Sequence, residues 1–295
     1  MGLLEQLNRL LADPPPGYVF EISEAGIAHA RLSEPERMGF RPLEAGVIAV
    51  SPVRDNVQIP EALAAAVASI YPGSAGKKRQ RAALILPDHC SRTAVLDFDS
   101  FPGSVAEQEA LVRFRMKKSI PFDVDSAVVS YHVQPRVPGN PHIEVIVSVV
   151  ALEIVARYEA PFRAAGYQPG LVTTSSLAAL NLVHAQEVTV LAKLTGNTLA
   201  VVILGGGIVK LVRCLELDDT TPEGVVAVLY PTFAYIEDEM GSKASRLLLC
   251  GFGASTDRLA QDWQADLGFP VEPLRSRFAT PGENNAGLLG FLEAA

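Results

Sequence analysis

The order of apolar and polar positions divides the chain into short strands and a smaller number of helices. Runs rich in Val, Ile and Leu, bounded by Gly, Pro, Asn, Asp or Ser, predict strands. Runs with apolar residues three and four positions apart predict helices. The predicted strands are residues 18–22, 27–32, 46–50, 82–86, 91–98, 127–133, 142–150, 168–173, 187–193, 201–204, 208–212, 246–250 and 270–272. The predicted helices are residues 59–70, 105–118, 153–165, 175–184 and 222–240, one ending at 263, and a tail helix over 284–292. This mixture is typical of an α/β protein.

The pattern occurs twice along the chain. Hairpins at residues 18–32 and 199–215 each open a unit of strands followed by a helix and a further strand. This arrangement resembles the duplicated actin-like, ribonuclease H-like fold, in which two such units face one another. We therefore expect a first half over residues 17–195, with an inserted subdomain at about 88–150, and a second half over 196–295.

The first 16 residues are expected to stand apart from these halves. Leucines recur along one face of a short helix, and Pro14, Pro15 and Pro16 follow it as a linker. This amphipathic helix is expected to pack on its own domain. Contact with a membrane or with a partner protein is the alternative.

Composition excludes several classes of function. With 295 residues, 48% hydrophobic and 20% charged, the chain can bury two domain-sized cores as a soluble protein. A net charge of -8 argues against nucleic acid as a partner. The longest apolar runs fall short of the roughly 20 residues that span a bilayer. Three cysteines without CxxC spacing predict no disulfide framework or zinc site and favour a reducing, cytoplasmic setting.

Three consecutive glycines, Gly205, Gly206 and Gly207, lie between two β-branched runs and predict a tight hairpin. This hairpin resembles the phosphate hairpin of the actin-like ATPases, in which a nearby acid positions metal and water. Glu21 matches the acid of the first such hairpin, with Ser23 in place of the usual glycine. Leu204 stands where the second hairpin normally carries its acid, and no acid occurs over residues 199–215.

The segment EQEALVRFRMKKSIPFDVDSAVVSYHV, residues 107–133, resembles the signature of the PilM family of type IV pilus assembly proteins. Residues 145–182 and 284–292 are similar to later blocks of that family. Gly251 and Gly253 lie in a segment, RLLLCGFGASTDRL, that resembles the turn facing the adenosine in actin-like folds. Family members usually carry a long insertion where this chain has only residues 217–246, so the second half is expected to be truncated.

The resemblance also implies a partner. In the PilM family the inserted subdomain helps form a groove for the N-terminal cytoplasmic tail of PilN, a bitopic inner-membrane protein. Carried over, residues 113–131 and the first hairpin would line that groove. The implied contact residues are Arg113, Lys117, Pro121, Phe122 and Tyr131.

The sequence offers no catalytic constellation. Asp88, His89 and Cys90 are adjacent, but strand neighbours point to opposite faces, so we interpret them as a loop rather than as a nucleophile with its base. No two histidines stand four residues apart, and no metal site is predicted.

We therefore expect a PilM-like scaffold, cytoplasmic and peripheral to the inner membrane, that binds its partner without hydrolysing ATP. No cofactor is expected, because loss of the second acid leaves less to orient Mg²⁺ and water. Glycine amides alone can hold phosphate, so binding of ATP and Mg²⁺ is left open. The alternatives are an active actin-like ATPase or sugar-kinase-like phosphotransferase, and a polymerising filament protein.

Overall fold

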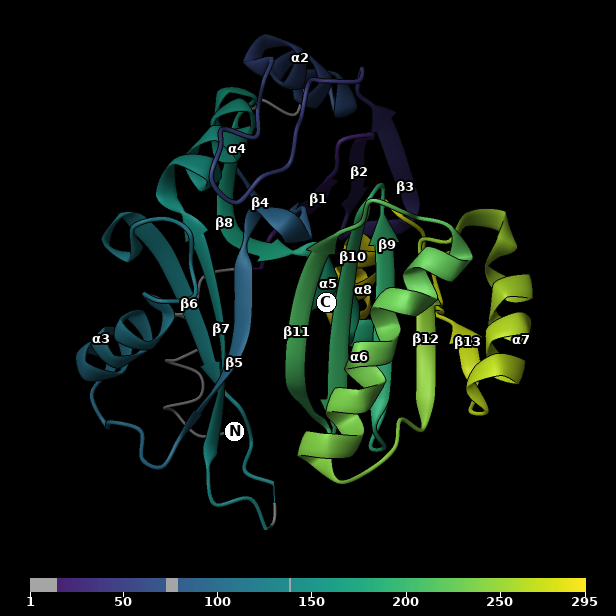
Figure 1. Ribbon diagram of the computed structural model, residues 1–295. Helices are drawn as coiled ribbons and strands as arrows, with labels where there is room; N and C mark the ends of the chain where they lie inside the picture. The colour runs from purple at the N-terminus through teal and green to yellow at the C-terminus, as the bar shows by residue number, and fades with distance from the viewer. Residues whose placement is uncertain (1–14, 73–78, 138) are drawn as a thin grey trace, which may run out of the picture.

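The computed structural model describes residues 15–72, 79–137 and 139–295. The N-terminal helix predicted from the leucine pattern lies outside the described residues. In the part of the chain that the structure describes, two five-stranded sheets share one strand order (Figure 1). The first sheet is β3 (Glu34–Pro42), β2 (Gly26–Arg31), β1 (Tyr18–Ile22), β4 (Gln80–Leu86) and β8 (Tyr167–Thr174). The second is β11 (Ile208–Glu216), β10 (Thr198–Gly205), β9 (Thr189–Thr195), β12 (Arg246–Cys250) and β13 (Val271–Pro273).

The two sheets also agree in strand direction. β1 pairs antiparallel with β2 and parallel with β4. In the same way, β9 pairs antiparallel with β10 and parallel with β12. β9 is therefore the counterpart of β1, and the glycine hairpin β10–β11 is the counterpart of β2–β3.

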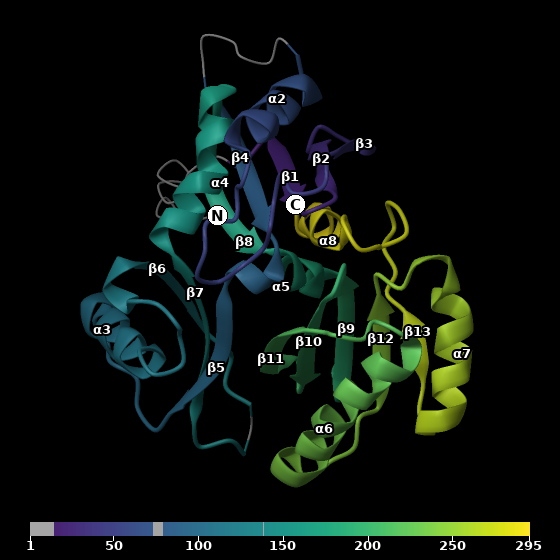
Figure 2. The same cartoon turned by 45° about the horizontal axis from the view of Figure 1, so that its top comes forward.

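Helices cover the sheets and fill the space between them (Figure 2). α8 (Ala286–Ala294) packs on α5 (Ser175–Ala179), and its side chains join apolar clusters with residues of both sheets. Its fit is close, because a Cβ at Gly290 would lie 2.1 Å from the carbonyl oxygen of Ala178. The other helices are α2 (Pro60–Ile70) and α4 (Leu152–Ala164) on the first sheet, α6 (Pro222–Met240) and α7 (Thr256–Leu267) on the second, and the short helices η1 (Asp88–Cys90), η3 (Leu180–Leu182) and η4 (Gly253–Ser255).

A third sheet forms a separate subdomain inserted into the first half. Its order is β5 (Arg92–Phe98), β7 (Ile143–Ala151) and β6 (Ala127–Val133). α3 (Val105–Met116) and η2 (Val124–Ser126) belong to the same subdomain and share its apolar core. Figure 1 shows this subdomain beside β11 of the second half.

Three sequence expectations need correction. Residues 46–50 form no strand beyond the single bridge between Ile48 and Val57. The third strand is β3, which the pattern missed because a polar edge strand lacks a clear apolar face. The single helix expected over 175–184 is α5 followed by η3. β9 was expected in the first half, but it pairs with β10 and so belongs to the second sheet. The boundary between halves therefore falls between Leu182 and Thr189, not at residue 195.

No helix among the described residues has both the length and the apolar character needed to cross a membrane.

Candidate functional site

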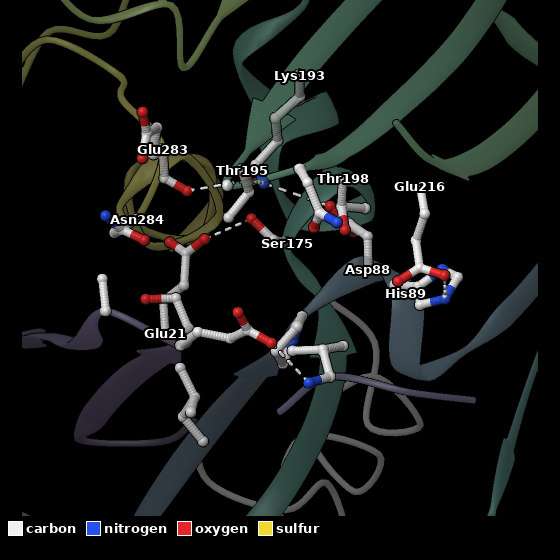
Figure 3. Close-up of a pocket in the computed structure, with 18 residues that line it drawn as sticks. Glu21, Asp88, His89, Ser175, Lys193, Thr195, Thr198, Glu216, Glu283 and Asn284 are labelled. Atoms are coloured by element: carbon white, nitrogen blue, oxygen red, sulfur yellow. Dashed lines mark hydrogen bonds and ion pairs between the residues drawn. The ribbon is translucent and has the colours of Figure 1, made fainter. Parts of the chain in front are cut away.

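A cavity of about 280 Å³ lies between the two halves (Figure 3). Its walls come from the end of β1 and the turn after it, from η1, from the start of α5, and from the β9–β10 turn. Five carboxylate side chains line it, together with Lys193 and His89. The five are Glu21, Glu24, Asp88, Glu216 and Glu283.

Lys193 is the central cation of this cavity. Its side chain is 1% exposed, and its ammonium lies 3.3 Å from a carboxylate oxygen of Asp88. The same ammonium donates to the hydroxyl of Thr195 at 2.7 Å. Burial alone would lower the pKa of Lys193, but the carboxylates of Asp88 and Glu21 raise the pKa above its ordinary value. Lys193 therefore remains protonated inside the protein.

The two acids beside Lys193 are themselves held by backbone amides. The second carboxylate oxygen of Asp88 accepts a hydrogen bond from the backbone N–H of Ser176 at 2.7 Å. Glu21 is 2% exposed and accepts from the backbone N–H of Leu288 at 2.7 Å and from the hydroxyl of Ser175. Burial raises the pKa of Glu21, whereas Lys193 and these donors lower it. The acids and the ammonium thus form one buried network between the halves.

Lys193 takes the place at which the second acid was expected. Glu21 pairs with Ala28 on β2, and Lys193 pairs with Ala200 on the equivalent strand β10. The second hairpin that faces the cavity is therefore β9–β10, with its turn at residues 196–197. The assignment of Gly205, Gly206 and Gly207 to that position was wrong, and so was the comparison of Leu204 with an acid. These glycines lie at the other end of β10, roughly 23 Å away at about 3.3 Å per residue.

The glycine turn instead contacts the inserted subdomain. Gly206 and Gly207 have φ of 63° and 79°, which favours glycine in a tight hairpin. Beside the turn, the side-chain amide of Gln134 exchanges two hydrogen bonds of 2.8 Å with the backbone N–H and C=O of Val209. A bulge leaves Lys210 between two strand pairs, and its ammonium lies 2.7 Å from Glu144. The hairpin therefore fastens the second half to the subdomain.

The other predicted nucleotide residues have different placements. Ser23 lines the cavity, but its hydroxyl donates to the carbonyl oxygen of Gly26 at 3.1 Å and so closes its own turn. Gly251 is buried against β9, where a Cβ would lie 1.9 Å from the carbonyl oxygen of Leu194. Gly253 lines a second cavity, of about 640 Å³, which shares Glu283 and Asn284 with the first.

His89 and the cysteines form no reactive centre. The Nε2 of His89 lies 3.3 Å from a carboxylate oxygen of Glu216, and its Nδ1 lies 3.9 Å from the sulfur of Cys214. Burial raises the pKa values of Cys90 and Cys214 well above the ordinary value, so both stay neutral thiols. Among the described residues, no group of His, Cys, Asp or Glu has the arrangement of a metal site.

The residues present do not fit a magnesium nucleotide. An ammonium replaces the expected second acid, so Glu21 has no acidic counterpart in β9. The remaining carboxylates at the cavity repel the negative charge of a triphosphate. Sequence reasoning missed Lys193, although a lysine within the apolar run of residues 190–194 was the available signal.

The five implied partner contacts are only partly brought together. Arg113 donates to the carbonyl oxygens of Val124 and Ala127, at 2.6 and 3.3 Å, and Tyr131 donates to Gln108 at 3.0 Å. These two side chains fasten α3 to its own subdomain, and Lys117 and Pro121 are exposed.

Phe122 lines a groove of about 730 Å³ between the subdomain and the first half. The first hairpin, expected beside this groove, contributes no residue to it. The loop over residues 53–55 and the start of α4 lie there instead.

Comparison with solved structures identifies the fold. The chain matches the PilM-PilN type IV pilus biogenesis complex with a TM-score of 0.75 and 18% identity, covering 95% of this chain and 98% of that chain. A Bacteroides thetaiotaomicron protein with an actin-like ATPase fold and unknown function matches with a TM-score of 0.53 and 12% identity, covering 93% of this chain and 94% of that chain. The cytoplasmic domain of EpsL, an inner-membrane component of the Vibrio cholerae type II secretion system, matches with a TM-score of 0.52 and 12% identity, covering 94% of this chain and 93% of that chain.

No protein-family model matches the sequence, and no curated protein is significantly similar to it. The structural matches establish that the chain has the actin-like fold, so the predicted fold class is confirmed. The resemblance of residues 107–133 to the PilM family agrees with the similarity of this fold to that of the PilM-PilN complex.

Proposed function

We propose that the protein is a scaffold of a type IV pilus or a related secretion machine. It binds the cytoplasmic tail of a PilN-like inner-membrane protein and does not hydrolyse ATP. Similarity of fold to the PilM-PilN complex and to the EpsL domain supports this role. The observation that carries it is the groove between the first half and the inserted subdomain. Through this partner the protein would be peripheral to the inner membrane, on its cytoplasmic side.

The groove combines apolar and acidic side chains. Its apolar lining includes Val53, Phe122 and Leu152. Val53 and Leu152 are 55% and 56% exposed, and Phe122 belongs to the inserted subdomain. Four acids, Asp55, Asp123, Asp125 and Glu153, outnumber the two arginines of the lining, of which Arg157 is paired with Asp55 at 3.1 Å. Cytoplasmic segments next to membrane spans are rich in Lys and Arg. A basic peptide with apolar anchors therefore matches the groove in charge and in polarity.

The tail peptide is expected to bind the wild-type protein, and a variant with Asp125→Asn and Glu153→Gln is expected to bind it about three- to tenfold more weakly. Both acids are exposed at the groove, and exposed ion pairs contribute about 0.2–1 kcal/mol each. Calorimetric titration with the N-terminal cytoplasmic segment of a PilN-like protein measures both affinities.

A matched control carries Asp262→Asn and Asp266→Asn on α7, which removes the same charge from exposed positions outside the groove. It should bind like the wild type. Equal weakening in both variants would show only a general charge effect. No binding at high micromolar peptide would overturn the scaffold proposal.

An active ATPase is the second candidate. It is favoured by the cavity beside Gly253, which adjoins the one that holds Lys193. Against it, Lys193 stands at the position of the second acid. We expect ATP with Mg²⁺ at millimolar concentration to leave the thermal midpoint unchanged and to release no phosphate. A clear upward shift, with phosphate release that falls in Glu21→Ala, would establish the ATPase instead.

A further inference from the structure

We propose that a smaller cavity behind Asp88 binds a tetrahedral oxyanion of the size of inorganic phosphate. This rear cavity encloses about 160 Å³. It shares one lining residue, Asp88, with the cavity that holds Lys193. The rear cavity belongs neither to the peptide groove nor to the nucleotide position of the fold.

Two guanidinium groups line the rear cavity, those of Arg92 and Arg213. Neither makes an ion pair with another residue of the described chain. The Nε–H of Arg92 is buried and has no hydrogen-bond partner among the described residues. A buried donor without an acceptor is costly, and a donor on a charged group more so. The site therefore carries positive charge and an unused donor.

The single carboxylate in the lining does not cancel this charge. Asp88 directs one oxygen to the ammonium of Lys193 and the other to the backbone N–H of Ser176. With both oxygens of Asp88 already bound to Lys193 and Ser176, the two arginines without ion-pair partners give the rear cavity a positive field. An anion is the ligand that such a field attracts.

Shape and polarity restrict the anion. Thr174 and Ser176 add hydroxyl-bearing side chains to the lining, whereas the hydroxyls of Ser91 and Thr93 already donate to the carbonyl oxygen of Asp88 and to Ser148. Guanidinium forks and hydroxyls are the donors that bind phosphate oxygens. A volume of about 160 Å³ admits inorganic phosphate or sulfate but is well below that of pockets for larger organic ligands. We therefore assign the site to a free oxyanion and not to a nucleotide.

The position of the rear cavity gives such an anion a structural consequence. Its walls come from the first half at Thr174 and Ser176, from the start of the inserted subdomain at Arg92, and from β11 of the second half at Arg213. One bound anion would therefore link all three parts of the molecule. Binding should raise the resistance of the whole fold to heat.

The test is a thermal unfolding series at 0–10 mM inorganic phosphate, with ionic strength held constant by NaCl. The wild-type midpoint is expected to rise by about 3 °C at tenfold excess over the dissociation constant. Arg92→Gln should lose this rise, with affinity weakened about tenfold or more. Arg37→Gln is the control, because the side chain of Arg37 is 81% exposed and pairs with Glu34 at the surface. ATP at the same concentrations should produce no comparable rise.

Two results would overturn the site. Phosphate stabilises many proteins by exclusion from their surface, so an equal rise in wild type and Arg92→Gln would indicate that general effect alone. If Arg92→Gln does not fold, equilibrium dialysis of the wild type with radiolabelled phosphate decides. Retention of about one phosphate per chain supports the site, and no retention at 10 mM excludes it.

Discussion

Replacing Lys193 with Met is expected to lower the free energy of unfolding by about 3–5 kcal/mol, the cost of leaving a buried charge without its partner. Methionine keeps much of the volume and removes the ammonium that faces Asp88 at 3.3 Å. The carboxylates of Asp88 and Glu21 would then remain buried without a cation. Urea-induced unfolding followed by circular dichroism measures the change.

The control for this substitution is Lys117→Met, at an exposed position at the end of α3, which should change stability little. Adding Asp88→Asn to Lys193→Met should recover part of the loss, because asparagine still accepts from Ser176 and removes the isolated charge. If Lys193→Met proves as stable as Lys117→Met, the ion network does not hold the halves together.

The pH dependence of stability provides a second readout of the same network. The folded protein raises the pKa of Lys193 above the 10.5 of the unfolded chain. Its contribution is therefore fully present below pH 10.5 and is lost as the pH rises through the folded value. The wild type should lose more stability than Lys193→Met above pH 10.5. Equal losses would indicate that other groups, such as the buried tyrosines, account for the alkaline fall.

The network also explains what the sequence could and could not reveal. The turn at Gly206 and Gly207 was recognised correctly as a hairpin, because a glycine pair between β-branched runs has few other solutions. Its assignment to the nucleotide position was wrong. Which hairpin faces the cavity depends on the pairing of strands that are distant in the sequence, such as β9 with β12. The short turn at residues 196–197 gave a weaker local signal, although it is the one that faces Glu21.

The remaining differences between the predicted and the observed positions of side chains arise from contacts inside the folded protein. The resemblance to the PilM family placed Phe122 at the groove, because it assigns a whole sequence segment to that surface. Arg113 and Tyr131 belong to the same segment, but their side chains turn inward to carbonyl oxygens and to Gln108. A sequence pattern locates a segment on a face, whereas the partners of one long polar side chain depend on the packed structure around it. The same applies to Lys193, whose two acids come from β1 and η1, far from it in the sequence.

Gly251→Ala is expected to lower the free energy of unfolding by about 3 kcal/mol or more, through left-handed strain and overpacking together. Gly251 has φ of 86°, and its new methyl group would lie 1.9 Å from the carbonyl oxygen of Leu194, next to Lys193 on β9. Either β9 or β12 would have to move, which would disturb the ion network. Urea-induced unfolding of the purified variants measures the loss.

Gly253→Ala separates the contact from the conformational strain. Gly253 has φ of 64°, so alanine at this position also loses about 1–2 kcal/mol through its left-handed backbone conformation. No atom lies within 4 Å of the added Cβ, so no overpacking is expected. The difference between the two variants therefore measures the approach of the glycine turn to β9. A large difference means that this turn is required for packing whether or not a nucleotide binds. Equal losses would contradict the close packing and leave nucleotide contact as the remaining explanation for Gly251.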